Sequence, residues 1–179
     1  KKKGNLIVEL DPEVTQLLSS LSSPTGSITA LKEILVPIDF SDCSKYALRY
    51  AAAFAGQFEA RITLLAVVQD VRTSFELGNP DHIEQLANRK LTYQQELKKL
   101  SQKELGKFPS TLLVRTGRPF EEIVTAASKL NSDLIVISTH GQTGFSKAEL
   151  GSTTERVIRY APCPVLVVRE KERAFAPPI

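Results

Sequence analysis

The sequence contains no tryptophan or methionine and only two cysteines, and aromatic residues make up 7% of its 179 positions. The cysteines, Cys43 and Cys163, lie far apart and form no CxxC pair, so the pattern predicts neither a zinc site nor a disulfide framework and favours reducing cytoplasm. No apolar run approaches the roughly 20 residues that a membrane-spanning helix needs. We therefore expect a soluble chain with no membrane contact.

A strong excess of charge of one sign is also missing. The formal net charge is +3, from 23 basic and 20 acidic residues, and the three N-terminal lysines account for all of it. A nucleic-acid-binding face would show clustered basic residues, often with interleaved aromatics, and the folded part shows neither. With 42% hydrophobic residues the chain can form one substantial core, and we expect no nucleic-acid partner.

Short apolar segments alternate with helical patterns along most of the chain. The expected strands are residues 33–39, 61–68, 111–116, 134–138 and 164–169, and the helices between them begin at Ser41 or Asp42, near Asp81, at Pro119 and near Gly151. Parallel strands need helical crossovers, which cover both faces of the sheet. The pattern predicts an open α/β fold with a five-stranded parallel sheet.

The two ends of the chain do not share this alternation. Residues 1–30 predict an N-terminal extension, with an amphipathic helical arm that begins near Asp11 and a Ser/Pro/Gly-rich linker at residues 22–27. The α/β domain is expected at residues 31–170, and residues 171–179 are expected to form an irregular tail.

A glycine-rich loop follows the fourth predicted strand and leads into a helix that starts Gly151-Ser152-Thr153. Free N–H groups and the positive end of the helix dipole make such a helix start suitable for a phosphate. A second interpretation remains open, because Ser152 and Glu155 also have the spacing of a capping box. Asp39, at the end of the first strand, can either accept hydrogen bonds from a nucleoside or cap the next helix.

Four features taken together resemble the universal stress protein family, in its ATP-binding branch. They are Pro37-x-Asp39, Ser138-Thr139-His140-Gly141, the Gly151-Ser152 pair after nine intervening residues, and the closing Pro162-Cys163-Pro164-Val165 segment. The resemblance covers about residues 31–169. It implies a Rossmann-like, adenine nucleotide alpha hydrolase-like topology with strand order 3-2-1-4-5, which places the strand reversal between the first and fourth strands.

The resemblance also implies the nucleotide contacts. The adenine and ribose would lie near the first two strands, and the phosphates near the glycine-rich loop and the following helix. The residues implied are Pro37, Ile38, Asp39, Val67, Ile137, Ser138, Gly141, Gly151, Ser152 and Thr153. Ser138 stands where the family motif has its first glycine, so its side chain would either crowd the ribose or donate a hydrogen bond to it.

The function that the resemblance implies is binding of ATP with Mg²⁺, as a regulatory or slowly hydrolysed ligand in a stress response. No GxxxxGK[ST] loop is present, so at most a slow ATPase is expected. His140 is expected to order its loop, and Lys147, Arg156 and Arg159 are candidate phosphate cations. The alternatives are a non-nucleotide dimerisation module, pairing through residues 164–169 as a homodimer, and an enzyme that acts on an adenylated small molecule.

Overall fold

The computed structural model describes residues 31–70, 80–106, 108–139 and 150–169, all within the compact unit that begins at Leu31. Its five strands form one parallel sheet in the order β3-β2-β1-β4-β5. The predicted five-stranded α/β fold and its strand order are therefore confirmed. Within these ranges no helix has the length and apolar character needed to cross a membrane.

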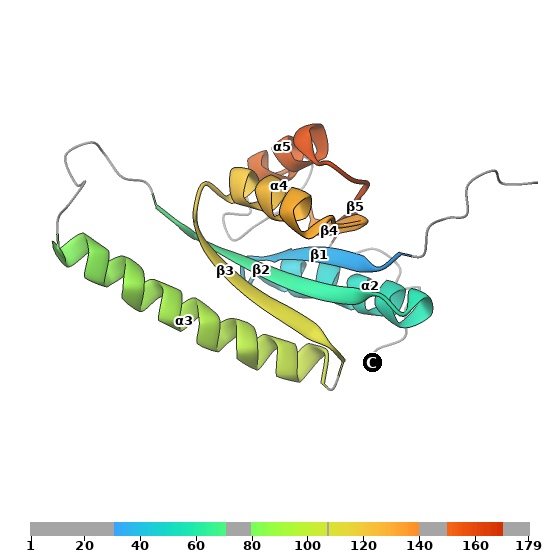
Figure 1. The fold of residues 1–179 in the computed structure, drawn as a ribbon, viewed down its shortest axis with the longest axis horizontal. Helices are drawn as coiled ribbons and strands as arrows, with labels where there is room; N and C mark the ends of the chain where they lie inside the picture. The colour runs from blue at the N-terminus through green and yellow to red at the C-terminus, as the bar shows by residue number, and fades with distance from the viewer. Residues whose placement is uncertain (1–30, 71–79, 107, 140–149, 170–179) are drawn as a thin grey trace, which may run out of the picture. The chain divides into compact units, whose positions relative to one another are not determined.

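Strands and helices alternate along the described chain, close to the predicted bounds (Figure 1). The strands are β1 (Glu33–Ile38), β2 (Arg61–Gln69), β3 (Ser110–Gly117), β4 (Leu134–Ser138) and β5 (Val165–Val168). The helices are α2 (Asp42–Phe58), α3 (Pro80–Glu104), α4 (Pro119–Leu130) and α5 (Ser152–Tyr160). Asp39 therefore lies just beyond the end of β1, and Gly151 just before α5.

The sheet separates two apolar clusters, because successive side chains of a strand point to opposite faces. Ile34 and Leu64 pack with α2 and α3 on one face, whereas Leu35 and Leu65 pack with α4 and α5 on the other. Figure 1 shows α4 and α5 together on one side of the sheet and α3 on the opposite side. Both faces of the central strands are covered, which explains their nearly continuous apolar sequences.

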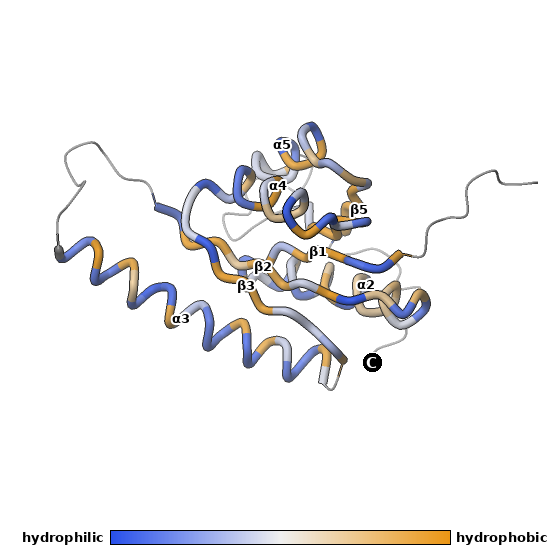
Figure 2. The backbone as a smooth tube through the Cα atoms, in the orientation of Figure 1, coloured by the Kyte–Doolittle hydropathy of each residue, from blue (hydrophilic) through white to orange (hydrophobic). Residues whose placement is uncertain are grey.

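Helix α3 is 25 residues long and half exposed, as its polar sequence predicts. Leu97 and Leu100 are buried in the core, whereas Ile83 and Leu91 in the N-terminal half are 60% and 55% exposed. Orange and blue stretches alternate along the helix in Figure 2, as expected when one face is apolar and the other polar. The helix thus packs on the sheet with its C-terminal half, and its other half reaches the carboxyl edge.

The central strand β1 is paired unequally with its two neighbours. Its register with β2 runs from Glu33 to Ile38, whereas its register with β4 covers Ile34 and Leu35. Pro37 lies two residues after Leu35 and has no N–H group to donate to either neighbour. The carboxyl ends of β1 and β4 therefore separate, at the point of the sheet where the strand order reverses.

The buried position of Leu64 allows a direct test of this core. Leu64 is fully buried, and its register partner Leu112 on the edge strand β3 is 39% exposed. We expect Leu64→Ala to lower the free energy of unfolding by about 2–5 kcal/mol, because the deletion leaves a cavity. The matched change Leu112→Ala should lower the free energy of unfolding by about 1 kcal/mol, because this side chain is already partly exposed. Urea denaturation measures both, and equal losses would contradict the described burial.

Candidate functional site

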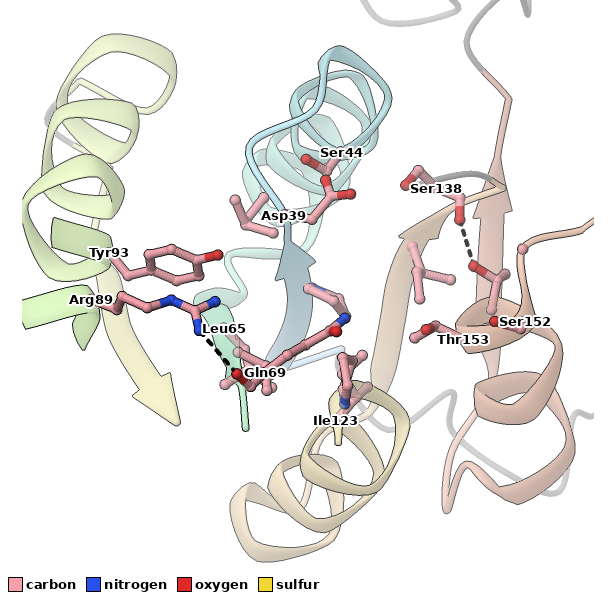
Figure 3. A pocket seen from close by; sticks show the side chains of 17 residues that line it. Asp39, Ser44, Leu65, Gln69, Arg89, Tyr93, Ile123, Ser138, Ser152 and Thr153 are labelled. Carbon is pink, nitrogen blue, oxygen red and sulfur yellow. Dashed lines mark hydrogen bonds between the residues drawn. The ribbon is translucent and has the colours of Figure 1, made fainter. Parts of the chain in front are cut away.

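A cavity of ≈ 370 Å³ opens at the carboxyl edge of the sheet, within the size range of small-molecule sites (Figure 3). It lies where β1 and β4 diverge, which is where open α/β sheets bind their ligands. Residues from three strands, from all four described helices and from two of the segments between them line it. They are Pro37, Ile38, Asp39, Ser44, Leu65, Val67, Gln69, Arg89, Tyr93, Pro119, Ile123, Ile137, Ser138, Gly151, Ser152, Thr153 and Thr154.

The structure brings nine of the ten residues named from the sequence to this one cavity. They come from three separated parts of the chain: the end of β1, the end of β2, and the stretch from β4 to α5. The tenth, Gly141, lies outside the described residues, as do Gly144, His140 and Lys147. The residues named from the sequence thus include members of three strand ends and of the helix start that border the cavity.

Asp39 supports a helix cap rather than forming the cap itself. Its Oδ1 accepts hydrogen bonds from the N–H and hydroxyl of Ser41, at 3.1 and 2.6 Å. Ser41 is the N-cap of α2, and its Oγ accepts from the N–H of Ser44 at 3.1 Å. Asp39 also lines the cavity, so the two roles considered for it are compatible: it orders the loop and faces the cavity.

The residue between Asp39 and the cap has an uncommon backbone conformation. Phe40 has a φ of 66°, in the left-handed region that a bulky residue seldom occupies. Its ring packs edge-on against Tyr93 of α3, with the ring centroids 5.1 Å apart. This aromatic contact holds the strained turn and joins the end of β1 to α3.

The start of α5 presents free backbone donors to the cavity. Gly151 is the N-cap, and the first intrahelical bond runs from the N–H of Glu155 to the carbonyl of Gly151, at 3.0 Å. The N–H groups of Ser152, Thr153 and Thr154 precede this bond, so the helix offers them no acceptor. This end of the cavity is suited to an anion.

The capping-box interpretation of Ser152 is wrong. A capping box needs the serine at the N-cap, but Ser152 is already the first residue of the helix and Gly151 occupies the cap. The side chain of Glu155 faces Arg159 instead, with Oε1 3.5 Å from its Nη2. The hydroxyl of Ser152 is therefore not used as the cap of α5, and the residue lines the cavity.

Two hydrogen bonds hold the start of α5 against the end of β4. The hydroxyl of Thr154 donates to the carbonyl of Ser138 at 2.8 Å, and the N–H of Gly151 donates to the carbonyl of Thr139 at 2.8 Å. Ser138, Thr139 and Thr154 are 6%, 5% and 4% exposed, so these polar contacts are shielded from water. Buried bonds of this kind are costly to break, and they set the position of the helix start.

Sequence analysis did not find the wall of the cavity formed by α3. Arg89 and Tyr93 come from this helix, and the guanidinium Nη1 of Arg89 donates to the carbonyl of Gln69 at 3.2 Å (Figure 3). No sequence motif marks these residues, because they reach the cavity through the packing of a whole helix on the sheet. The same is true of Pro119 and Ile123 on α4.

Two cations considered for the phosphate end have other contacts and do not line the cavity. Arg156 lies over the ring of Phe120, 5.0 Å from its centroid, and Arg159 pairs with Glu155. Arg89 is the one cationic side chain among the described lining residues, and Asp39 the one carboxylate. The polar groups that the described start of α5 offers to the cavity are therefore backbone N–H groups and hydroxyls.

The cysteines lie outside the cavity lining and are not joined by a disulfide in the described structure. Burial raises the pKa of the Cys163 thiol above its usual value, and the nearby Asp133 carboxylate acts in the same direction. Cys163 is thus less ionised at neutral pH than an ordinary cysteine. No group of three His, Cys, Asp or Glu side chains capable of holding a metal occurs in the described ranges.

The fold and the cavity define an open, parallel α/β protein with a cavity at its strand-order reversal, where proteins of this class bind ligands. Comparison with known proteins identifies the family. The model of the universal stress protein family matches residues 30–169. The chain belongs to the universal stress protein family.

Relatives and solved structures agree with this assignment. The chain is 38% identical to universal stress protein MJ0531 of Methanocaldococcus jannaschii over 147 residues, which are 79% of this chain and 84% of that protein. A solved structure of protein MJ0577, also from Methanocaldococcus jannaschii, superposes with a TM-score of 0.66 and 31% identity, over 81% of this chain and all of that one. Universal stress protein UspA from Lactobacillus plantarum gives a TM-score of 0.63 at 27% identity, over 79% and 99% of the two chains.

The bond from Thr154 to Ser138 provides a test of how the helix start is positioned. Thr154→Val keeps the shape of the side chain but leaves the Ser138 carbonyl without this donor, so we expect a loss of about 1–2 kcal/mol in unfolding free energy. Hydrogen exchange of the Glu155 amide should accelerate as the first turn opens more often. Thr154→Ser keeps the hydroxyl and should leave this exchange rate near that of the original protein. Equal exchange in all three proteins would show that the bond does not position α5.

Proposed function

We propose that this protein binds ATP in the cavity at the carboxyl edge of the sheet, as a regulatory or slowly hydrolysed ligand. The observation that carries the proposal is the convergence of the nine described motif residues on one cavity of ≈ 370 Å³. Residues from β1, β2 and α5 are far apart in sequence, and the fold brings them to one site.

The two ends of the cavity suit the two ends of a nucleotide. On one side, Thr153 and Ser152 lie at the start of α5, where the amide donors favour phosphate oxygens (Figure 3). Toward the other side, Val67, Leu65 and Ile123 supply apolar surface for a base. Asp39 lies between these ends in Figure 3, where its carboxylate can accept hydrogen bonds from ribose hydroxyls.

Ser138 is compatible with this ligand although the family motif has glycine there. The residue is 6% exposed, and its carbonyl is occupied by the Thr154 hydroxyl. A side chain with so little accessible surface takes little space from the ribose. We therefore favour the interpretation in which Ser138 borders the ribose without excluding it.

The described phosphate end supports binding more strongly than rapid hydrolysis. Its residues offer hydroxyls and amides, and no lysine, arginine or carboxylate lines that end in the described ranges. Mg²⁺ commonly binds through nucleotide phosphates with few protein ligands. Magnesium would therefore enter on the phosphates of ATP, and no side chain of this chain is assigned to it.

Two other proteins of this fold support an adenine nucleotide as the ligand class. A universal stress protein was solved in complex with cAMP, at 21% identity and a TM-score of 0.57. A universal stress protein from Archaeoglobus fulgidus was solved in complex with dAMP, at 24% identity and a TM-score of 0.50. At these identities the likeness is one of fold, and it supports the proposal by showing that the fold accommodates such ligands.

A direct test is to denature the purified protein, chromatograph the released small molecules, and titrate the nucleotide-free protein with Mg·ATP by calorimetry. We expect bound adenine nucleotide or a binding isotherm below millimolar ATP. Gly151→Val should weaken binding by more than about 10-fold, because a branched side chain would occupy space needed by a phosphate.

The backbone at Gly151 makes this variant informative. Its φ of −62° and ψ of 145° are open to any residue, so valine should not strain the backbone, and thermal unfolding of the variant checks that the fold is kept. Gly56→Ala is the matched control, since a methyl group there has nothing within 4 Å and the residue does not line the cavity. If no nucleotide is released and millimolar ATP gives no heat, the ATP proposal is wrong. The chain would then be better described as a member of the family branch that does not bind nucleotide.

A second proposal concerns self-association through β5, the edge strand of the sheet. The segment Val165–Val168 is wholly apolar, and three of its four residues are partly exposed. An apolar edge with unpaired backbone groups favours pairing with a second strand. We expect a homodimer at micromolar concentration in sedimentation velocity, and a monomer under those conditions would count against this interface.

A further inference from the structure

Helix α3 contributes a wall to the cavity that the family motif does not include. Arg89 and Tyr93 are four residues apart, so they lie on the same face of the helix, one turn from each other. Both face the end of the cavity bordered by Gln69 at the end of β2 (Figure 3). This wall belongs to α3, whereas the helix start proposed to bind phosphate belongs to α5.

One contact links each side chain to the region where a strand ends: Arg89, which is exposed, contacts Gln69 of β2, and Tyr93, which is half-buried, contacts Phe40 beyond β1. The Arg89 guanidinium donates to the Gln69 carbonyl at 3.2 Å, which keeps it at the β2 end of the cavity. The Tyr93 ring packs against Phe40 at an interplanar angle of 84°, and its hydroxyl points toward the middle of the cavity in Figure 3. The two side chains therefore border the cavity at its Gln69 end.

The position of Arg89 separates it from the phosphate end. Figure 3 places Arg89 and Tyr93 on one side of the cavity and Ser152 and Thr153 on the other, with Asp39 between them. A nucleotide whose phosphates contact the start of α5 would direct its base toward α3. The guanidinium would then meet the base and not the phosphates.

We infer that Arg89 is a specificity-determining residue that selects purine over pyrimidine nucleotides, with Tyr93 as the second group of this wall. The inference rests on the proposed nucleotide function. A guanidinium carries five N–H donors and no acceptor, and one donor is used by Gln69. Its planar face stacks on aromatic rings, and its other donors match ring-nitrogen acceptors.

A purine base can make more contacts with Arg89 and Tyr93 than a pyrimidine base can. Its two fused rings offer a larger face for stacking, and its five-membered ring adds the N7 acceptor, which pyrimidines lack. Tyr93 supplies a hydroxyl that can donate to or accept from the edge of the base. A pyrimidine held by the same phosphate contacts is shorter and presents fewer acceptors to Arg89.

The test is to titrate the protein and its variants by calorimetry with Mg·ATP, Mg·UTP and inorganic tripolyphosphate. Arg89→Ala should weaken ATP binding by about 10-fold, the size expected from a lost cation–aromatic contact, while UTP and tripolyphosphate change by less than about twofold. The preference for ATP over UTP should therefore fall. Arg89→Lys keeps the positive charge but lacks the planar guanidinium, so it should restore only part of the preference for ATP over UTP.

Two controls separate base recognition from other roles of Arg89. Lys90→Ala removes one positive charge from the next residue, which does not line the cavity, and should leave all three affinities unchanged. Thermal unfolding of each variant reports whether loss of the Gln69 contact destabilises α3. A structural role alone would lower stability without changing the ratio of ATP to UTP affinity.

The possible outcomes distinguish this inference from the proposed function. If the original protein binds ATP and Arg89→Ala leaves the ratio of ATP affinity to UTP affinity unchanged, this inference alone is wrong. Equal weakening of ATP and tripolyphosphate also overturns it, because Arg89 would then act on phosphate. Failure of the original protein to bind ATP at all overturns the proposed function, and this inference with it.

Discussion

The separation of β1 from β4 beyond Leu35 is the constraint on which the site depends. Pairing between these strands is registered at Ile34 and Leu35, and Pro37 then offers no N–H group. Were the two strands hydrogen-bonded to their ends, their carboxyl termini would be closed against each other. Because they diverge, Asp39 and Ser138 border a cavity, and the helix that follows β4 can direct its N-terminus into it.

The borders of this opening are held by buried polar contacts. Thr154 and Gly151 donate to the carbonyls at the end of β4, while on the other side Ser41 caps α2 and Asp39 accepts hydrogen bonds from Ser41. A site whose donors are already oriented needs little rearrangement when an anion arrives, and this preorganisation favours affinity. The left-handed turn at Phe40 is part of the same arrangement, because its ring holds Tyr93 beside the cavity.

The two ends of the cavity differ in chemistry because they are formed by different parts of the fold. At the start of α5 the groups are amides and hydroxyls, which suit phosphate oxygens. At the end of β2 the wall combines apolar side chains with Arg89 and Tyr93 from α3. A ligand with an anionic end and an aromatic end fits this asymmetry, and both proposals about the ligand derive from it.

By itself, the sequence determined the family, the five strands and their order, and the three stretches that supply the motif residues. The strands and the helix start depend on local features, because apolar runs set the strands and glycines and small residues mark the helix start. The strand order, in contrast, followed from the resemblance to the family. The interpretation of Ser152 as a cap was wrong, since the cap position depends on where α5 begins, a boundary that spacing alone leaves uncertain by a residue. The tertiary structure alone decided that Arg89 and Tyr93 border the cavity, because a long helix without a motif reaches it through packing on the sheet.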